Sequence, residues 1–429
     1  MNKKITFFLL TIFIIISFSI IAYQPAEVVI IGPRFHEQDY FIEELDLIAE
    51  ELGIKIKYNA ISDPETFIIE NPDSKGSIAI IPNPQGVVNL AQRNLIFNLE
   101  NIVVDNDSIS NLYSNHLTSI VSHEGSLYAG WTRLFPNSLI WYDISKFELN
   151  NINAGSKAYS WSFEDFETLL KNTKQIADKG FSPWCANSES SASTGWIQTN
   201  WLEDILLTKY GPLIYDDWSD LKIDASNIKI YLSIKYLEEF IFYENHIHKG
   251  SQSIINKEFR NLPKVMLDDS NDCFLSWSGH YFRYYIPEEY TYLEDYAVAP
   301  LPKINFDNSV VGIGDNIVLI NSDDLSQKVI SKILSKNFGE TWSAHQDSHF
   351  ISANKNFNKN KIINKLTLYE YSIVHNALKE DLFRFDASEV MPRNIGANKL
   401  WTFFYNYINE GPQNLITLLN NLDKEISGY

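Results

Sequence analysis

Residues 27–60 read EVVIIGPRFHEQDYFIEELDLIAEELGIKIKYNA, and this stretch decides the fold class. Glu27 to Gly32 is a short apolar run that ends in a Gly-Pro turn, which predicts a buried strand. Glu37 to Leu52 repeats apolar residues at helical spacing, and Ile54 to Ala60 alternates like a strand. The order strand, helix, strand predicts an α/β sheet with loops at the strand ends.

Two turns at the predicted strand ends supply the first candidate binding residues. Ser77 to Ile81 predicts another strand, which stops at PNPQG. Ligands of open α/β sheets bind outside the carboxyl ends of the strands. Gln85 donates and accepts hydrogen bonds, and Gly86 lets a ligand approach the backbone; the alternative is a simple turn. Arg34, after the first strand, is a further candidate, whose alternative is a solvated surface position.

Strands and helices continue to alternate up to the end of the chain. Tyr128–Tyr142 predicts a strand pair, and Val310–Asn321 predicts a strand, a glycine turn and a second strand. The other predicted elements are a strand at Tyr296–Pro302, helices at Ser162–Gly180, Ile228–Tyr243 and Asp323–Phe338, and helical stretches near residues 366–380, 397–409 and 413–426.

The length of 429 residues predicts two or three domains, and the formal charge is −19. The first 24 residues hold two lysines and no acidic residue, so the remainder carries −21, which is −19 less two positive charges. A nucleic-acid surface needs clustered Lys and Arg, so this balance argues against a nucleic-acid partner. It suits an exported protein whose ligand is neutral or weakly charged.

Residues 1–24 predict export. MNKK is a short basic segment, and Ile5 to Tyr23 is almost wholly apolar. The apolar run approaches the roughly 20 residues that span a bilayer, so it is either a cleaved signal or a retained N-terminal anchor. No cysteine stands near its end, which excludes a lipoprotein anchor. We expect a periplasmic protein.

Only two cysteines occur, Cys185 and Cys273, and an exported chain with two cysteines suggests one disulfide. The alternative is two buried free thiols. His345 and His349 form an H-x-x-x-H pair, but Gln346 stands where a metalloprotease has its Glu. We therefore predict no metal site and no cofactor.

A tryptophan-rich stretch, PWCANSESSASTGWIQTNWLEDILLTKYGPLIYDDW at residues 183–218, indicates a carbohydrate-binding cleft. Indole rings offer flat apolar faces, and carboxylates accept hydrogen bonds from hydroxyl groups. A sugar has both kinds of surface. The alternative is an ordinary tryptophan-rich core.

Several segments together resemble the extracellular solute-binding proteins of ABC sugar importers, in particular the α-glucoside type. They are GPRFHEQDYF, SIAIIPNPQGVVNLAQRNLIFNLE, LYAGWTRLFPNSLIWYD, PWC…TGW…NWLED, CFLSWSGHYF, VVGIGDN and FDASEVMP. The resemblance covers about residues 28–402. PWC…TGW…W-x-x-D with its downstream cysteine is the most specific element. The chain departs from the family at Trp131 and Asn137 and at Ser276-Trp277, so the exact sugar stays open.

The resemblance implies a fold and a function. The fold is the α/β, two-lobe periplasmic-binding-protein fold of type II, in which each lobe is a central β-sheet flanked by helices and the ligand cleft lies between the lobes. Residues 27–142 and 298–338 would form lobe 1, and residues 143–297 and 339–429 would form lobe 2. The chain would be a monomer without enzymatic activity that delivers an α-glucoside to the transmembrane subunits of an ABC permease. Closure around the sugar is a hinge motion.

The resemblance and the residue chemistry together nominate the ligand contacts. A glycine turn would present Asp315, and helical spacing would put Trp201 and Asp204 on one face. For each candidate the alternative is structural, such as core packing for a Trp or a helix cap for an Asp. The full set is Arg34, Gln85, Gly86, Trp131, Trp161, Gly195, Trp196, Asp204, Gly312, Gly314, Asp315 and Asp386.

Two other functions fit parts of the pattern. A glycoside hydrolase needs two carboxylates spaced across the scissile bond, and Asp204 with Asp315 is the pair that the sequence offers. No hydrolase motif accompanies that pair. A sugar sensor that presents its loaded surface to a membrane receptor would share the cleft but not the importer.

Overall fold

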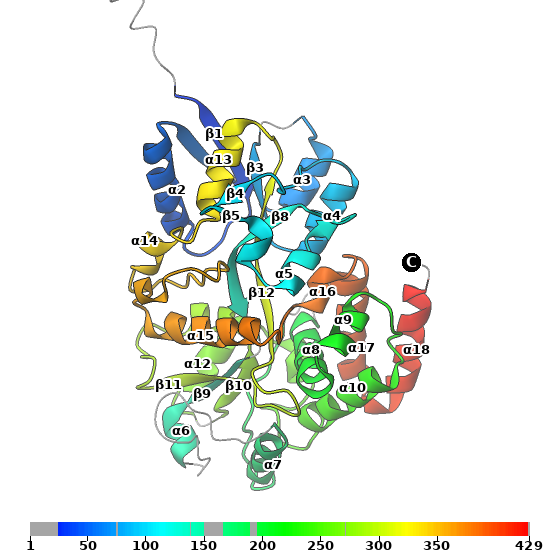
Figure 1. Cartoon of the computed structure of the whole chain (residues 1–429). Helices are drawn as coiled ribbons and strands as arrows, with labels where there is room; N and C mark the ends of the chain where they lie inside the picture. The colour runs from blue at the N-terminus through cyan, green and yellow to red at the C-terminus, as the bar shows by residue number, and fades with distance from the viewer. Residues whose placement is uncertain are drawn as a thin grey trace, which may run out of the picture.

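The computed structural model describes residues 25–73, 76–137, 139–149, 166–188, 195–270 and 272–427. Two β-sheets lie in opposite halves of the molecule, and helices cover both (Figure 1). We call these halves the six-stranded half and the three-stranded half after their sheets. Trp161 and the predicted export segment 1–24 lie outside the described residues.

The six-stranded sheet confirms the α/β pattern predicted from residues 27–60. Its order is β13-β12-β3-β1-β2, and β8 also pairs with β12. β1 runs parallel to β2 and to β3, whereas β12 runs antiparallel to β3. The strands are β1 (Glu27–Gly32), β2 (Lys55–Ala60), β3 (Ile78–Ile81), β8 (Ala129–Pro136), β12 (Val310–Leu319) and β13 (Phe383–Phe385).

β12 is one continuous strand, so the predicted glycine turn inside Val310–Asn321 is wrong. The neighbouring strands β13 and β8 approach Gly312 and Gly314 so closely that a side chain would not fit at either position. A Cβ atom on Gly312 would lie 2.4 Å from the Phe383 ring, and one on Gly314 would lie 2.4 Å from the Arg133 carbonyl oxygen. These glycines permit close packing of strands rather than a reversal of the chain.

The three-stranded sheet has the order β10-β9-β11, with both outer strands antiparallel to β9. The predicted pair within Tyr128–Tyr142 does form two strands, but they do not pair with each other. β8 pairs with β12, whereas β9 belongs to this second sheet. The strands are β9 (Leu139–Asp143), β10 (Leu275–Ser278) and β11 (Tyr296–Pro300).

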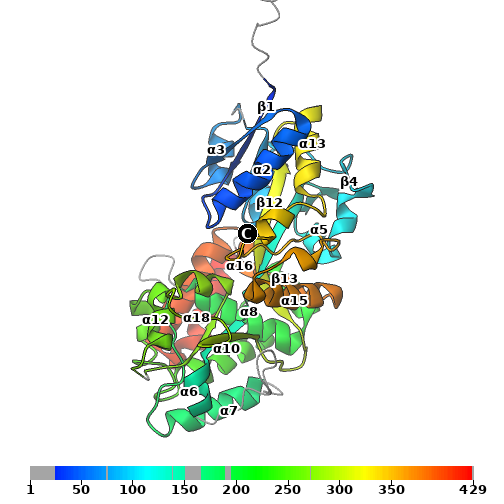
Figure 2. The same ribbon diagram turned by 90° about the vertical axis from the view of Figure 1, so that its left-hand side faces the viewer.

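Three passages of the chain between the halves lie side by side. Gly312 of β12 is the register partner of Pro136 on one edge and of Phe385 on the other. The Asn137 amide donates to the Val311 carbonyl, and the Asp386 amide donates to the Gly312 carbonyl, both at 2.8 Å. Figure 2 shows β12 and β13 at the level where the halves meet. These adjacent crossings connect the two halves.

Helices cover both sheets and confirm the helical stretches expected from the sequence within the described residues. Around the six-stranded half lie α2 (Gln38–Leu52), α3 (Pro64–Glu70), α4 (Pro84–Gln92), α5 (Asn115–Ser119), α13 (Asp324–Ile333) and α14 (Glu340–Ser343). α15 (Lys365–Lys379) lies where the halves meet and contacts β8 and β12. The other helices are α6 (Ile144–Leu149), α7 (Phe166–Ala177), α8 (Trp196–Tyr210), α9 (Pro212–Ser219), α10 (Ile228–Ile241), α11 (Ser253–Asn256), α12 (Leu262–Leu267), α16 (Ala387–Val390), α17 (Trp401–Glu410) and α18 (Leu415–Ile426). Among the described helices, none is both long and apolar enough to cross a membrane.

The division into lobes at residues 142, 297 and 338 stays a prediction. α14 packs on α2, and the Trp342 amide donates to the Glu44 carboxylate at 2.8 Å. Because β13 also pairs with β12, segments beyond residue 338 still belong to the first sheet. We propose that the crossings between the lobes lie at Asn137, at 309–312 and at Asp386.

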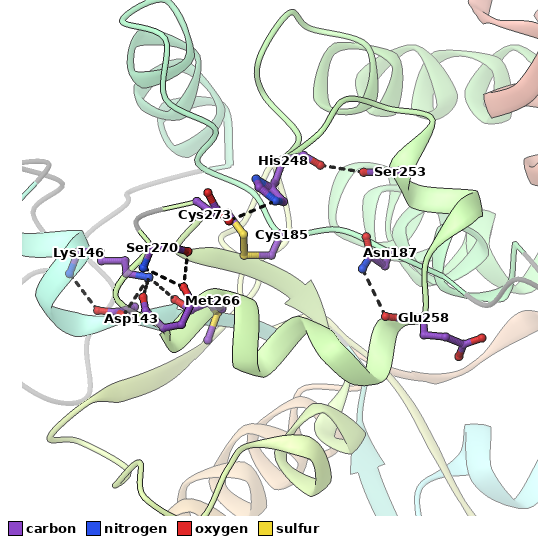
Figure 3. The surroundings of a disulfide bond; sticks show 12 residues. Asp143, Lys146, Cys185, Asn187, His248, Ser253, Glu258, Met266, Ser270 and Cys273 are labelled. Carbon is purple, nitrogen blue, oxygen red and sulfur yellow. Dashed lines mark hydrogen bonds and ion pairs between the residues drawn. A yellow bond between two sulfur atoms is a disulfide. The ribbon is translucent and has the colours of Figure 1, made fainter.

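The two cysteines form the expected disulfide, and the alternative of free thiols is wrong. Cys185 and Cys273 are bonded with their Cα atoms 5.4 Å apart. The bond ties the segment after α7 to the start of β10 (Figure 3). Nearby, the buried Lys146 ammonium donates to the Met266 carbonyl at 2.8 Å, which fixes the end of α12.

We predict that replacing both cysteines with serine lowers the free energy of unfolding by about 4 kcal/mol, because the disulfide closes a long loop in the unfolded chain. The cysteines are 88 residues apart in sequence. Urea unfolding of wild type and of the double Ser variant measures the difference. A reductant should lower the stability of wild type and leave that of the variant unchanged; equal stability of the two proteins would contradict the prediction.

Candidate functional site

A cleft of about 1170 Å³ lies between the two halves. Its walls come from the loop after β1, the starts of α3 and α4, strands β8 and β12, the 3-10 helix η3 (His280–Tyr285) and the segment 388–401. A side chamber of about 290 Å³ adjoins it. The cleft and the chamber share Ile313, Ser388, Glu389 and Trp401.

One wall is built from the N-termini of two helices that follow parallel strands. α3 starts after Asp63, whose carboxylate accepts a hydrogen bond from the Thr66 amide at 3.1 Å. α4 starts after Asn83, which accepts from the Gly86 amide at 2.7 Å. The caps hold Asp63, Asn83 and Gln85 at the edge of the cleft, where open α/β sheets bind their ligands.

A buried ion pair between Arg133 of β8 and Asp315 of β12 lines the cleft. The Arg133 Nε donates to Asp315 Oδ2 at 2.5 Å, and the two side chains are 10% and 14% exposed. Burial by itself would lower the pKa of Arg133, but the Asp315 carboxylate raises that pKa above its ordinary value. Arg133 therefore stays charged next to the cleft.

Aromatic rings surround the Arg133 guanidinium. Its central carbon lies 4.4 Å from the ring centre of Phe35, 5.0 Å from that of Phe135 and 5.1 Å from that of Trp342. Glu37 accepts a hydrogen bond from the Trp342 indole at 2.6 Å and fixes that ring. Cation–π contacts of this kind attract the planar guanidinium to the ring faces and so help to fix its orientation.

The opposite wall is η3. His280 stacks on Phe135 with ring centres 4.2 Å apart and is 5% exposed. Burial, helped by the positive charge of Arg283, holds the pKa of His280 well below its ordinary value. The imidazole is therefore neutral at physiological pH, and it offers the cleft a flat polarisable face rather than a charge.

Two contacts join the halves across the cleft. The His36 ring, after β1, stacks on the Tyr284 ring of η3 with centres 4.2 Å apart. Arg393, between α16 and α17, forms an ion pair of 3.0 Å with Asp63 at the start of α3. Both contacts bring the halves together around the enclosed space.

The side chamber combines indole faces with hydrogen-bonding groups. Trp196, Tyr281 and Trp401 supply the rings. With the Asn200 amide of α8 turned so that its oxygen and nitrogen each meet a partner, it donates to Asp386 Oδ2 at 2.9 Å and accepts from the Asn137 amide group at 3.2 Å, which links α8 to two of the chain crossings. Flat apolar faces beside fixed polar groups suit a ligand that has both, such as a sugar ring.

Buried carboxyl groups gather behind this chamber. Burial, followed by the charge of Asp386, raises the pKa of Glu203 well above its ordinary value. Burial and the same neighbour raise the pKa of Glu389 to about 7. A protonated carboxyl group donates as well as accepts a hydrogen bond. The part of the chain that the structure describes contains no cluster of three or more His, Cys, Asp or Glu arranged to hold a metal ion.

The structure brings five of the predicted site residues to the cleft or its side chamber. Gln85, Gly314 and Asp315 line the cleft, and Trp196 and Asp386 line the chamber. Asp386 is also the predicted helix cap, since it accepts from the Ser388 amide at 2.9 Å. Their contact with ligand stays a proposal. Trp161 lies outside the described residues.

Trp131 and Asp204 lie in the core rather than in the cleft. Trp131 is 1% exposed, and its indole donates to the Leu117 carbonyl at 2.9 Å. Asp204 is 2% exposed and accepts a hydrogen bond from the Trp277 indole at 2.7 Å. Trp184, Trp201 and Trp218 are buried as well, so the core interpretation of the tryptophan-rich stretch holds for three of its four tryptophans.

Of the four remaining predicted residues, the three glycines have structural roles. Gly195 has φ +115°, and a Cβ atom there would lie 2.0 Å from the Trp401 carbonyl oxygen, so close backbone packing explains it. Gly86 takes part in the α4 cap, and Gly312 packs against Phe383. Arg34 is exposed and lies outside the lining of the cleft.

Sequence reasoning missed Arg133, His280, Tyr284, Glu389 and Trp401, all of which line the cleft. Arg133 lies in LYAGWTRLFPNSLIWYD and His280 in CFLSWSGHYF, two segments that carry the family resemblance. The signal that could have found Arg133 and His280 is a polar residue within a largely apolar segment that resembles the family. Nothing local marks Trp401, which reaches the cleft only through the packing of segment 388–401.

No family model matches the chain. A comparison with known proteins nevertheless finds two relatives that are both described as binding proteins. The osmoprotective compounds-binding protein GgtB of Synechocystis sp. (strain ATCC 27184 / PCC 6803 / Kazusa) is 25% identical over 399 residues, which cover 91% of each chain. The alpha-glucosides-binding periplasmic protein AglE of Rhizobium meliloti (strain 1021) is 25% identical over 393 residues, which cover 88% of this chain and 82% of AglE. The resemblance to sugar-binding proteins of ABC importers, of the α-glucoside type, is confirmed.

Solved structures share the fold. The bacterial solute receptor AcbH has a TM-score of 0.73 at 11% identity, over 94% of this chain and 99% of its own. The expected two-lobe α/β fold is confirmed by this likeness.

We predict that Asp315→Ala lowers the free energy of unfolding by about 3–5 kcal/mol, because it leaves the buried Arg133 charge uncompensated. Urea unfolding measures this loss. Asp220→Ala is the matched control, since its partner Lys222 is 61% exposed and the pair contributes about 1 kcal/mol or less. A loss for Asp315→Ala no larger than that of the control would show that the ion pair does not hold the cleft together.

We predict that the difference in Tm between wild type and Glu389→Gln falls as pH rises from about 4.5 to 7 and is constant above pH 7. A carboxyl group whose pKa is raised on folding keeps its proton in the folded state over that range, so its contribution to stability decreases with pH. Thermal unfolding at a series of pH values gives the curve. A difference that stays flat or rises over this window would be inconsistent with a raised pKa.

Proposed function

We propose that this chain, a homologue of the sugar-binding proteins of ABC importers, is the solute-binding component of such an importer. It captures an α-glucoside or a glucosylated compatible solute by hinge closure and delivers it to the permease in the cell envelope. The observation that carries this proposal is the cleft itself. The two halves contribute the indole faces of Trp196 and Trp401, a fixed ion pair and amide groups to one cleft and its side chamber.

The substrate class is supported by the relatives. AglE is described as a binding protein for alpha-glucosides, and GgtB as one for osmoprotective compounds. Both alignments span most of this chain, so the similarity includes both halves and the segments between them. Glucosylglycerol, sucrose, trehalose and maltose are the ligands that we propose to compare.

Hinge closure is supported by the contacts across the cleft. The His36–Tyr284 stack and the Asp63–Arg393 ion pair each join one half to the other. Opening the cleft would break both contacts and leave the three adjacent crossings as the connection. A bound sugar that touches both walls would favour the closed arrangement, because it adds contacts that only this arrangement offers.

The hydrolase alternative gains no support from the positions of its two carboxylates. Asp204 is buried against Trp277 and does not line the cleft, and Asp315 is committed to Arg133. A glycosidase needs two carboxyl groups that flank the scissile bond. Sustained turnover of nitrophenyl glucosides by the purified protein would nevertheless overturn the binding proposal.

Calorimetric titration with glucosylglycerol, sucrose, trehalose, maltose and glucose tests the proposed function. We expect at least one of the four glucosides to bind with a micromolar or lower Kd, and glucose to bind more weakly because it fills less of the cleft. If none of the five sugars produces heat of binding, the protein is not a glucoside-binding component.

We predict that Trp196→Ala raises the Kd for the tightest-binding sugar at least about tenfold, which is ~1.4 kcal/mol, because it removes an indole face from the side chamber. The same titration measures the change. Trp131→Phe is the control: its indole is buried in the core, so it should lower Tm and leave the Kd unchanged. Equal Kd values for wild type and Trp196→Ala would exclude the chamber as part of the site.

A further inference from the structure

Arg133 presents two hydrogen-bond donors to the cleft that the protein itself does not use. Its Nε atom donates to Asp315. Among the residues that the structure describes, no side chain or backbone group accepts a hydrogen bond from either terminal nitrogen of this guanidinium. The side chain is only 10% exposed, and it lines the cleft. Neither nitrogen is among the fully buried polar atoms that lack a partner, so both are open to the cleft and can donate to a ligand there.

The guanidinium is also held in a fixed orientation. Phe35, Phe135 and Trp342 approach it from three directions, while Asp315 holds one edge. A guanidinium is planar, and its remaining N–H groups point outward in a fork. A ligand that meets this fork therefore does so without ordering a flexible side chain, which reduces the entropic cost of binding.

A guanidinium fork matches two kinds of partner. One is a carboxylate or phosphate, which accepts two parallel hydrogen bonds. The other is a pair of hydroxyl oxygens on adjacent carbon atoms, which lie at a similar separation. The first partner is an anion and the second is neutral, so the charge of the surrounding cleft distinguishes them.

The charge of the cleft favours the neutral partner. Asp315 already compensates Arg133, and Asp63 pairs with Arg393. Glu65 also lines the cleft, so carboxylates outnumber guanidinium groups by three to two even without Glu389, whose pKa is raised. An anionic ligand would meet unfavourable electrostatic interactions with these carboxylates, whereas a neutral diol would not.

We propose that Arg133 determines specificity by binding two adjacent hydroxyl groups of a neutral sugar or polyol. This inference rests on the proposed function, because it names how the same cleft recognises its ligand. Asp315 is then a positioning residue that orients the guanidinium. The role requires both the charge of Arg133 and its forked shape.

Arg133→Lys tests this role, because lysine retains the charge that Asp315 needs but lacks the fork. One probe is whichever of glucosylglycerol, sucrose, trehalose and maltose binds wild type most tightly. The other probes are the monodeoxy derivatives of that sugar. In wild type we expect the loss of either of two adjacent hydroxyl groups to raise the Kd about tenfold. In Arg133→Lys the parent sugar should bind at least tenfold more weakly, and those two derivatives should bind within about threefold of the parent.

Arg384→Lys is the matched control, since Arg384 is also buried (5% exposed against 10% for Arg133) and bonds Asp216 but does not line the cleft. It should keep the wild-type Kd and the wild-type deoxy penalties. Urea unfolding establishes that each variant is folded. If Arg133→Lys does not fold, the measurements on wild type alone test the proposal. Two adjacent hydroxyl groups whose removal each raises the Kd about tenfold would support it. The absence of any such pair would overturn it.

Three outcomes count against the proposal. Deoxy penalties that are the same in Arg133→Lys and in wild type would show that Arg133 does not bind hydroxyl groups. Tighter binding of a glucuronide than of the corresponding glucoside would show that the fork binds a carboxylate instead. If no sugar binds wild type, the proposed function fails together with this inference; if sugars bind and the penalties are unchanged, only the inference fails.

Discussion

The close packing of β12 between β8 and β13 is the constraint on which the rest of the structure depends. Gly312 pairs with Pro136 on one side and with Phe385 on the other, and there is no room for a side chain at Gly312 or at Gly314. This packing sets three passages of the chain side by side. It also brings Asp315 of β12 next to Arg133 of β8. The connection between the halves and the charged part of the cleft therefore arise from the same strand contacts.

Burial explains why the cleft contains charged groups that stay charged and others that do not. Arg133 and Asp315 compensate each other, so neither pays the full cost of leaving water. Glu203 and Glu389 lack such a cation at hydrogen-bond distance among the described residues, and burial raises the pKa of both. His280 is kept neutral by burial and by Arg283. The cleft thus combines two ion pairs, Arg133–Asp315 and Arg393–Asp63, with neutral donors and acceptors, which suits a ligand that is polar and uncharged.

The sequence predicted most helices and strands correctly, because the spacing of apolar residues that marks each of them lies within the element itself. The apolar run at Glu27–Gly32 and the helical spacing up to Leu52 need no distant partner to be recognised, and both elements formed as expected. The errors concern pairing. Gly312 and Gly314 suggested a turn, but their lack of side chains serves contacts with β13 and β8. Trp131 and Asp204 suggested ligand contacts, but Leu117 and Trp277 occupy their polar atoms.

The sequence by itself determined the fold class, the disulfide partners, the resemblance to sugar-binding proteins and five of the residues at the cleft. These follow from periodicity, from the presence of only two cysteines and from motifs that are continuous along the chain. Only the tertiary structure decided that Trp196 and Trp401 line the side chamber, and that Arg133 rather than Arg34 lines the cleft. The physical reason is that a side chain's exposure depends on which distant segments pack near it, as segment 388–401 shows by lining the same cleft as β12.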